Sequence, residues 1–393
     1  MNIDVTWLLL GLPLAFVLGW MASRVDLRQL RIENKRSPKA YFKGLNYLLN
    51  EQQDLAIDAF IEAVQNDPDT SELHFALGNL FRRRGEYDRA VRVHSHLLSR
   101  GDLKRDERDR AQHALSLDFI QAGLLDRAED ALTKLEGTRF EAQARLARLP
   151  IHERTRDWSA AAHIAEQLQA AGQGDFSARK AHYLCEQAAP LALAAAGAQS
   201  NQAAMALLQQ AIQTAPEASR ARIALSALQC DLGQYNDAYA TLVDVIQHTP
   251  AATPLIAQTL ASLAQQCNQT SQALELLQAY YAQSRSVDAL EAIIALQNGM
   301  QPTTDSVSDS TRILYAQHLE KEPSLSVAAR WLAGEKLAHE EFHPPVQRAL
   351  DKAVKPLLRY RCAACGFEAQ RHFWQCPGCQ AWDSYPARRI EEL

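Results

Sequence analysis

The sequence has little excess charge, almost no strand pattern and none of the common catalytic fingerprints. Its 41 Lys and Arg stand against 46 Asp and Glu, and the net charge of -5 provides no basic field to attract nucleic acid. We find no Walker loop, no GxGxxG after a strand and no nucleophile elbow. With 47% apolar and 22% charged residues, the 393-residue chain is still expected to fold, as several units. We therefore expect a protein that is neither an enzyme nor a nucleic-acid-binding protein.

An uncharged apolar run, VTWLLLGLPLAFVLGWMA, occupies residues 5–22 and is about long enough to cross a bilayer. Only Asp4 carries side-chain charge before it, whereas a cleaved signal peptide would start with positive charge. Basic residues follow it, at Arg24, Arg28, Arg31, Lys35, Arg36 and Lys39. By the positive-inside rule, we predict an inner-membrane protein with a periplasmic N-terminus and a cytoplasmic body. The predicted anchor is 1–23 and the basic juxtamembrane linker 24–36; a buried helix of a soluble protein is the alternative.

Small residues recur every fourth position along this run, at Gly11, Ala15 and Gly19. Such spacing lets a second membrane helix approach closely, so we predict a helix-packing face there. Glycine and alanine are also common in any membrane helix, and Pro13 interrupts the local geometry. Simple abundance of small residues is the competing interpretation.

Residues 37–298 show an internal repeat, marked by an alanine where the two helices of a hairpin would cross. The markers are Ala56, Ala90, Ala128, Ala161, Ala204, Ala238 and Ala273. Their separations are 34, 38, 33, 43, 34 and 35 residues, close to the period of tetratricopeptide helix-turn-helix units. The pattern predicts an all-α tetratricopeptide-repeat superhelical solenoid. An ordinary helical bundle is the alternative.

Several residues have a physical reason to recur in these units. Gly44 and Gly78 leave room where two helices touch, and Gly85, Gly123 and Gly233 fit turns that need a left-handed residue. The gap of 43 and the run PLALAAAGAQ from Pro190 indicate a break or insertion in the middle of the array.

Stacked hairpins leave a concave surface that usually binds other proteins. In the second repeat we expect Phe75, Asn79, Arg82 and Arg83 on this surface. Two arginines beside an aromatic ring suit an acidic or carboxylate-bearing client. A solvated basic patch is the alternative.

A loop and two helices are predicted over 299–358. GMQPTTDSVSDS from Gly299 is rich in turn formers, and Pro344 and Pro345 separate two segments with helical apolar spacing. Residues 339–343, HEEFH, match the H-E-x-x-H pattern of zinc proteases. Two prolines follow directly and no third ligand stands in a recognisable motif, so we favour a solvated helix end.

The knuckle, residues 359–393, contains two Cys-x2-Cys pairs separated by ten residues: Cys362, Cys365, Cys376 and Cys379. Two such turns facing each other can close a tetrahedral thiolate shell. The segment resembles a rubredoxin-like zinc ribbon. Gly366 and the Pro377-Gly378 turn are expected to supply unusual backbone angles, and Phe367, Phe373, Trp374 and Trp382 a small core.

We predict one zinc ion, with iron as the alternative and two disulfides disfavoured in the reducing cytoplasm. Cys185, Cys230 and Cys267 have no partners in this pattern and are expected to be small buried residues.

An N-terminal anchor, tetratricopeptide repeats and a C-terminal CxxC, CPxC knuckle together resemble the lipopolysaccharide assembly protein B family of Gram-negative bacteria, over the whole chain. The resemblance implies an adaptor that restrains lipopolysaccharide synthesis by helping the membrane protease FtsH degrade the deacetylase LpxC, under an inner-membrane regulator. Only the four cysteines are carried over residue by residue. A general envelope assembly or chaperone scaffold, a rubredoxin-like redox carrier, and homo-oligomerisation stay open.

Overall fold

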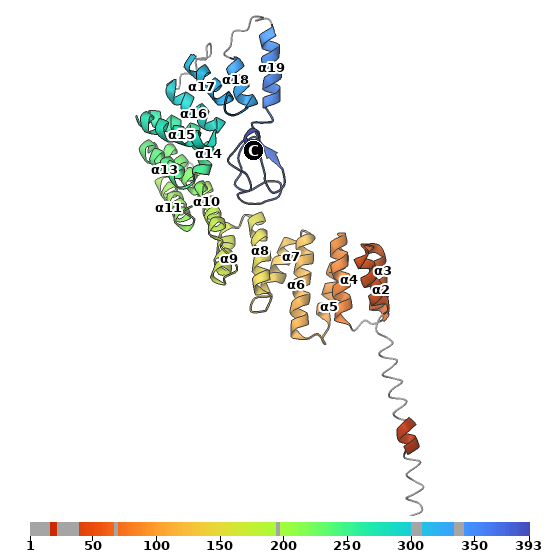
Figure 1. The fold of residues 1–393 in the computed structure, drawn as a ribbon. Coiled ribbons are helices and arrows are strands. Elements are labelled where there is room, and N and C mark those ends of the chain that lie inside the picture. The colour runs from red at the N-terminus through yellow and green to blue at the C-terminus, as the bar shows by residue number, and fades with distance from the viewer. Residues whose placement is uncertain (1–15, 22–38, 67–69, 194–196, 300–308, 334–341) are drawn as a thin grey trace, which may run out of the picture. The chain divides into compact units, whose positions relative to one another are not determined.

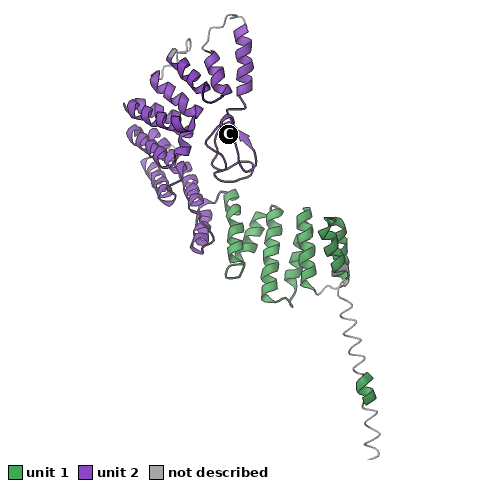
Figure 2. Ribbon diagram, in the orientation of Figure 1, with its two compact units in different colours: residues 1–155 green, residues 156–393 purple. Residues whose placement is uncertain are grey.

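The computed structural model describes residues 16–21, 39–66, 70–193, 197–299, 309–333 and 342–393 (Figure 1). The chain divides into two compact units, residues 1–155 and 156–393 (Figure 2). Each unit is a series of helices that pack in pairs, and the second also carries the knuckle.

Unit 1 is built from antiparallel helix pairs that follow one another along the chain. Its helices are α2 (Lys39–Leu49), α3 (Gln53–Asn66), α4 (Ser71–Arg84), α5 (Tyr87–Ser99), α6 (Arg105–Gln121), α7 (Leu125–Thr133) and α8 (Glu141–Thr155).

Unit 2 continues the helical series and includes a two-stranded antiparallel sheet in its C-terminal part. Its elements are α9 (Trp158–Ala170), α10 (Ser177–Leu193), α11 (Ala198–Thr214), α12 (Ser219–Asp231), α13 (Tyr235–His248), η1 (Pro250–Ala252), α14 (Thr253–Gln266), α15 (Thr270–Ser284), α16 (Val287–Gln297), α17 (Asp309–Leu319), α18 (Leu325–Ala333), α19 (His343–Val354), β1 (Tyr360–Arg361), β2 (Glu368–Ala369) and η3 (Ile390–Glu392).

The alanine markers identify buried helix contacts. All seven are 0% exposed. Six lie in the second helix of a hairpin, from Ala56 in α3 to Ala273 in α15, whereas Ala161 lies in α9, the first helix of unit 2, which packs against α10. A larger side chain at these points would push the paired helices apart, because protein interiors are close-packed. The prediction of an all-α tetratricopeptide solenoid is confirmed.

Two glycines mark an even closer approach of neighbouring helices. A Cβ atom on Gly44 would lie 2.9 Å from the Phe60 ring, and one on Gly78 would lie 2.5 Å from the His94 ring. The turn glycines also behave as expected, since Gly85, Gly123 and Gly233 have φ of 84°, 75° and 74°.

Two parts of the array depart from a series of equal repeats. The marker gap of 43 contains α10, and both α10 and α11 are long helices of 17 residues each. After Tyr280 the helical region continues with α16 and α17. Both helices carry buried apolar residues, such as Ile293 in α16 and Tyr315 in α17, without the repeat markers.

The predicted membrane anchor falls mostly on residues that the structure does not describe. Residues 16–21 are helical, and no helix within the described ranges has the length and apolar character to cross a bilayer. Gly11 and Ala15 of the predicted packing face lie outside those ranges. No neighbouring atom comes within 4 Å of a Cβ placed on Gly19.

The contact at Gly78 gives a stability prediction. Gly78→Ala should lower the free energy of unfolding by about 1–3 kcal/mol, because its methyl group would overlap the buried His94 ring. The urea midpoint of the full chain measures this. Gly101→Ala is the matched control, since a Cβ at Gly101 meets nothing within 4 Å. Equal midpoints for the two variants would contradict the close contact.

Candidate metal centre and its seat on the repeat array

The first cysteine turn of the knuckle is closed by backbone hydrogen bonds beside the small sheet. β1 and β2 pair Tyr360 with Ala369 and Arg361 with Glu368. The Cys362 N–H donates to the Phe367 carbonyl at 2.9 Å, and the Gly366 N–H donates to the Cys362 carbonyl at 2.9 Å. Gly366 has φ of 77°, as its predicted role requires.

The second turn repeats this geometry with a different residue in the left-handed position. The Cys376 N–H donates to the Ala381 carbonyl at 2.9 Å, and the Gln380 N–H donates to the Cys376 carbonyl at 2.8 Å. Gln380 has φ of 61°, whereas Gly378 is not left-handed. The prediction for Gly378 is therefore wrong. A Cβ there would lie 3.4 Å from the Phe367 ring, so the glycine sits close to this ring.

The two turns bring all four sulfur atoms together. The Sγ atoms of Cys362, Cys365, Cys376 and Cys379 lie within 4.8 Å of one another. The Cys362 and Cys379 sulfurs are 3.8 Å apart, and the Cys365 and Cys376 sulfurs are 3.7 Å apart. A regular tetrahedron with metal–sulfur bonds of about 2.3 Å has an edge of about 3.8 Å. The donor set and spacing therefore fit a tetrahedral metal ion, which would fold the knuckle by closing its two turns.

Burial and hydrogen bonding shift the pKa values of the Cys362 and Cys365 thiols in opposite directions. Burial opposes ionisation of Cys362, but the Ser384 hydroxyl and the backbone at Cys365 and Ala364 bring its pKa down to about 6. A hydrogen bond from the Phe367 backbone lowers the pKa of Cys365, yet desolvation and the neighbouring sulfurs raise it to about 12. Metal binding must displace the protons that remain, so metal affinity falls as pH falls.

The other cysteines lie among the helices. Cys185 is 4% exposed, and burial raises its pKa to about 11. Cys230 and Cys267 are partly buried and pack against the core formed by α13 to α16. These thiols are packing residues, as the sequence indicated.

The aromatic residues of the knuckle are divided between two surroundings. Its small core consists of Tyr360, Cys362, Cys376 and Tyr385, with Phe373 packed against it. Phe367 is 44% exposed and lies outside this core. Trp374 and Trp382 were expected around the metal, but both lie against the helices. The sequence did not predict that Tyr360 and Tyr385 belong to this core, because their positions depend on the strand pairing and on the path of the chain after the second turn.

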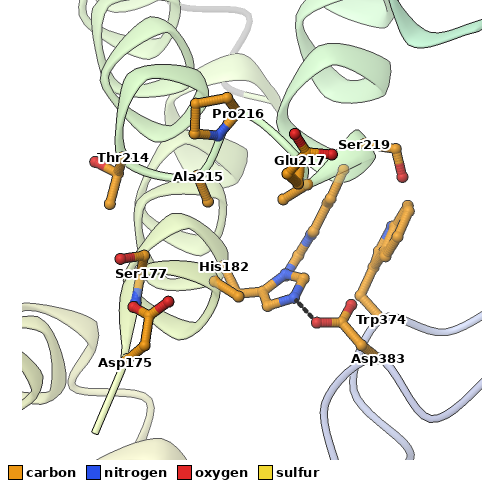
Figure 3. A pocket seen from close by; sticks show the side chains of 13 residues that line it. Asp175, Ser177, His182, Thr214, Ala215, Pro216, Glu217, Ser219, Trp374 and Asp383 are labelled. Carbon is orange, nitrogen blue, oxygen red and sulfur yellow. Dashed lines mark hydrogen bonds and ion pairs between the residues drawn. The ribbon is translucent and has the colours of Figure 1, made fainter. Parts of the chain in front are cut away.

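Trp382 and Asp383 join the knuckle to α10 and α12. The His182 ring stacks on Trp382 with centroids 4.7 Å apart. The Nε2 atom of His182 is hydrogen-bonded to Asp383 Oδ2 at 2.8 Å (Figure 3). The Arg220 guanidinium lies 5.7 Å from the Trp382 ring centroid and donates to Glu186 at 2.6 Å. His182 is only 1% exposed. Because the contact follows Cys379 by three and four residues, the metal turn positions it.

The last residues of the chain fix the knuckle to two further helices. Arg389 makes paired bonds of 3.1 and 3.2 Å to the Asp288 carboxylate, and its guanidinium lies 4.3 Å from the Tyr360 ring centroid. Glu392 accepts the Val287 N–H at 2.6 Å, and Glu391 accepts the Ser326 N–H at 2.9 Å.

These two glutamates thus satisfy N–H groups at the starts of α16 and α18, where negative charge is favourable. Burial is the main reason that the pKa of Glu392 lies above its usual range.

A recess of about 430 Å³ opens where the knuckle meets the array (Figure 3). It is bordered by the starts of α10 and α12, the loop between α11 and α12, and the knuckle residues Trp374 and Asp383. Carboxylates of Asp175 and Glu217 lie on its wall with His182 and Arg220. Any group entering this recess would contact both parts of unit 2.

The predicted client-binding residues of the second repeat do not form an open surface. Phe75 is 2% exposed and packs with Leu97, Leu103 and Ala111. Arg82 donates to Asp118 at 2.8 Å and to the Ala114 carbonyl at 3.0 Å. The prediction is wrong for Phe75, which lies in the interior of unit 1, whereas Arg82 is half-buried, with 20% of its side chain exposed, and forms this ion pair.

The remaining two predicted residues are more accessible. Asn79 is half-buried and accepts a bond from Arg82, while Arg83 is exposed. Only Arg83 of the original four still offers an exposed charge.

Arg82 belongs to a buried polar cluster that the sequence did not reveal. Asp118 is 0% exposed, and its two oxygens bond to Arg82 and to the equally buried His94. Partners that meet across three helices, α4, α5 and α6, cannot be identified from repeat spacing alone. Charge reversal at Arg82 would therefore disrupt folding, because it would leave Asp118 buried beside a like charge.

Comparison with known proteins matches both parts of the chain. The rubredoxin metal binding domain model matches residues 360–385, and a tetratricopeptide repeat model matches residues 195–263. Lipopolysaccharide assembly protein B of Escherichia coli strain K12 is 31% identical, over 98% of this chain and 99% of that protein. The Haemophilus influenzae protein of the same name is 30% identical, over 96% of each.

Among solved structures, a tetratricopeptide repeat protein from Parabacteroides merdae is similar, with 13% identity and a TM-score of 0.33. The match covers 66% of this chain and 98% of that one.

The sulfur cluster predicts about one metal ion per chain, lost in Cys376→Ser, because three thiolates leave an open shell on a segment too small to fold unaided. Metal analysis of the purified variant measures this, and helical circular dichroism should persist. Cys267→Ser, outside the cluster, should keep its metal. Full metal content in Cys376→Ser would refute the assignment.

The contact between the knuckle and helix α10 gives a second stability prediction. Trp382→Ala should keep its metal but lower the free energy of unfolding of unit 2 by about 1–3 kcal/mol, because the ring packs on His182. Thermal unfolding with metal analysis measures both quantities. Phe367→Ala removes a partly exposed knuckle ring and serves as the control. A destabilisation no larger in Trp382→Ala than in Phe367→Ala would argue against the contact.

Proposed function

Because the chain belongs to the lipopolysaccharide assembly protein B family, we propose that it is a membrane-tethered adaptor that restrains lipopolysaccharide synthesis. In this proposal it presents the deacetylase LpxC to the membrane protease FtsH, and an inner-membrane regulator controls it. The observation that carries the proposal is the similarity to these relatives along essentially the full chain, which includes both the tetratricopeptide repeats and the metal-binding segment of this chain.

The architecture supports an adaptor rather than a catalyst. Stacked helical repeats present an extended surface on which a client segment can lie. A four-sulfur metal site is a closed shell without a coordination position for a substrate, so it suits a structural role. In this role the metal would order the turns of the knuckle, and the knuckle in turn contacts the helices of the array through Trp382, Asp383 and Arg389.

Zinc is the metal we propose for this site. Zinc prefers four-coordinate tetrahedral thiolate sites and has no redox chemistry, and both properties suit a structural site. Iron uses the same ligands in rubredoxin-type centres. A colourless, redox-silent protein with about one zinc per chain supports zinc, whereas a coloured protein that can be reduced would support iron.

Tethering is proposed to matter as much as the binding surface. An anchor over 1–23 would hold the array in the cytoplasm next to a membrane-embedded protease. A weak contact then gains effective concentration without any new interaction. Reporters fused at the C-terminus should be active only in the cytoplasm, and periplasmic activity would overturn this topology.

The proposal predicts a change in LpxC lifetime. Cells carrying the full chain as their only copy should degrade LpxC several-fold faster than cells carrying residues 24–393, because the untethered form loses effective concentration. Pulse-chase measurement of LpxC gives the result, and circular dichroism of both forms checks folding. A chimera with an unrelated single-pass helix of the same orientation tests tethering alone.

Equal LpxC lifetimes with and without the anchor would contradict the tethering proposal. A general envelope scaffold would leave LpxC unaffected by the full chain while changing the recovery of other envelope proteins. Affinity capture from membranes followed by mass spectrometry separates this outcome from the proposed one.

A further inference from the structure

Helix α2, the first of the array, has two apolar faces. Tyr47 and Leu48 pack against the core of the first hairpins, and Gly44 lies against Phe60. Phe42, Leu45 and Leu49 lie on another side, with 62%, 37% and 76% of their surface exposed. Their spacing of three and four residues places them in one stripe along the helix.

Such a stripe is unusual at the end of a repeat array. Terminal repeats usually carry a polar outer face, because no neighbouring repeat covers them. Single exposed leucines need no explanation, but three large apolar side chains on an 11-residue helix form a contiguous surface. This exposed apolar stripe is therefore a candidate contact surface.

The charges around the stripe favour an anionic partner. Helix α2 contains Lys39 and Lys43 and no acidic residue. Over residues 24–43, seven Lys and Arg stand against two acidic residues, Asp26 and Glu33. Two copies of this helix would repel each other, whereas the cytoplasmic leaflet of a bacterial membrane carries complementary negative charge.

The chain length also keeps α2 close to a bilayer. Residues 23–38 separate the apolar run from Lys39. These sixteen residues span at most about 55 Å even when fully extended. A membrane in which the apolar run is anchored is thus always within reach of the stripe.

We propose that α2 lies on the cytoplasmic membrane surface, with Phe42, Leu45 and Leu49 in the headgroup region and Lys43 beside lipid phosphates. A basic face next to bulky apolar residues is the pattern of helices that lie in this interface. The contact rests on the membrane tether of the proposed function. It gives the array a second attachment to the bilayer, at its first helix.

The test uses p-benzoylphenylalanine at single positions of the full chain, reconstituted in phosphatidylethanolamine–phosphatidylglycerol vesicles. Light should produce lipid adducts several-fold more often from position 45 or 49 than from position 124. Leu124 is the matched control, because it is 40% exposed and lies in the same unit. Phosphatidylcholine vesicles should reduce the adducts at 45 and 49, because they remove the anionic charge.

Position 20, inside the apolar run, separates failure of this contact from failure of the anchor. Adducts at 20 with none above the control level at 45 and 49 would overturn the surface contact and leave the anchor standing. Absence of adducts at all positions would overturn both. Cross-linked dimers in place of lipid adducts at 45 and 49 would assign the stripe to a second copy and overturn the proposal.

Discussion

The gathering of four cysteine sulfurs into one site that fits a metal ion is the constraint on which the contacts of the knuckle with the helices of unit 2 rest. Residues 360–385 have only a small core, in which Tyr360 and Tyr385 flank two of the ligands. A segment of this size usually needs metal or disulfide support. The energy of metal binding is then folding energy for both turns. Trp382 and Asp383 follow the second turn directly, so their contact with His182 depends on the same shell.

The consequences continue beyond the knuckle through the end of the chain. Arg389 holds Asp288, and Glu391 and Glu392 receive N–H groups at the starts of α18 and α16. These helices therefore obtain part of their N-terminal hydrogen bonding from residues more than sixty positions away in the sequence. Unit 1 is held differently, by alanine and glycine crossings and by the buried carboxylate of Asp118 between Arg82 and His94.

The sequence was informative wherever one residue type meets one steric demand. The seven alanine markers, the close glycines at 44 and 78, and the four ligands all follow from local rules of size, backbone angle or coordination. It was less informative where a side chain finds its partner across helices. Phe75 and Arg82 look like surface residues by repeat position, but Phe75 is interior and Arg82 is half-buried in an ion pair, because α6 supplies Ala111 and Asp118.

In the knuckle, too, the sequence does not identify which residues of other elements a side chain contacts. Nothing in the spacing of the cysteines identifies His182 as the partner of Trp382.

Hydrogen exchange of the full chain, compared with metal bound and after chelation, tests most directly whether the metal site also orders the helices that the knuckle contacts. We predict that chelation increases exchange in α10, α12 and the first turns of α16 and α18 as well as in the knuckle. Increased exchange confined to residues 360–385 would contradict it, because the metal would then organise only its own loops.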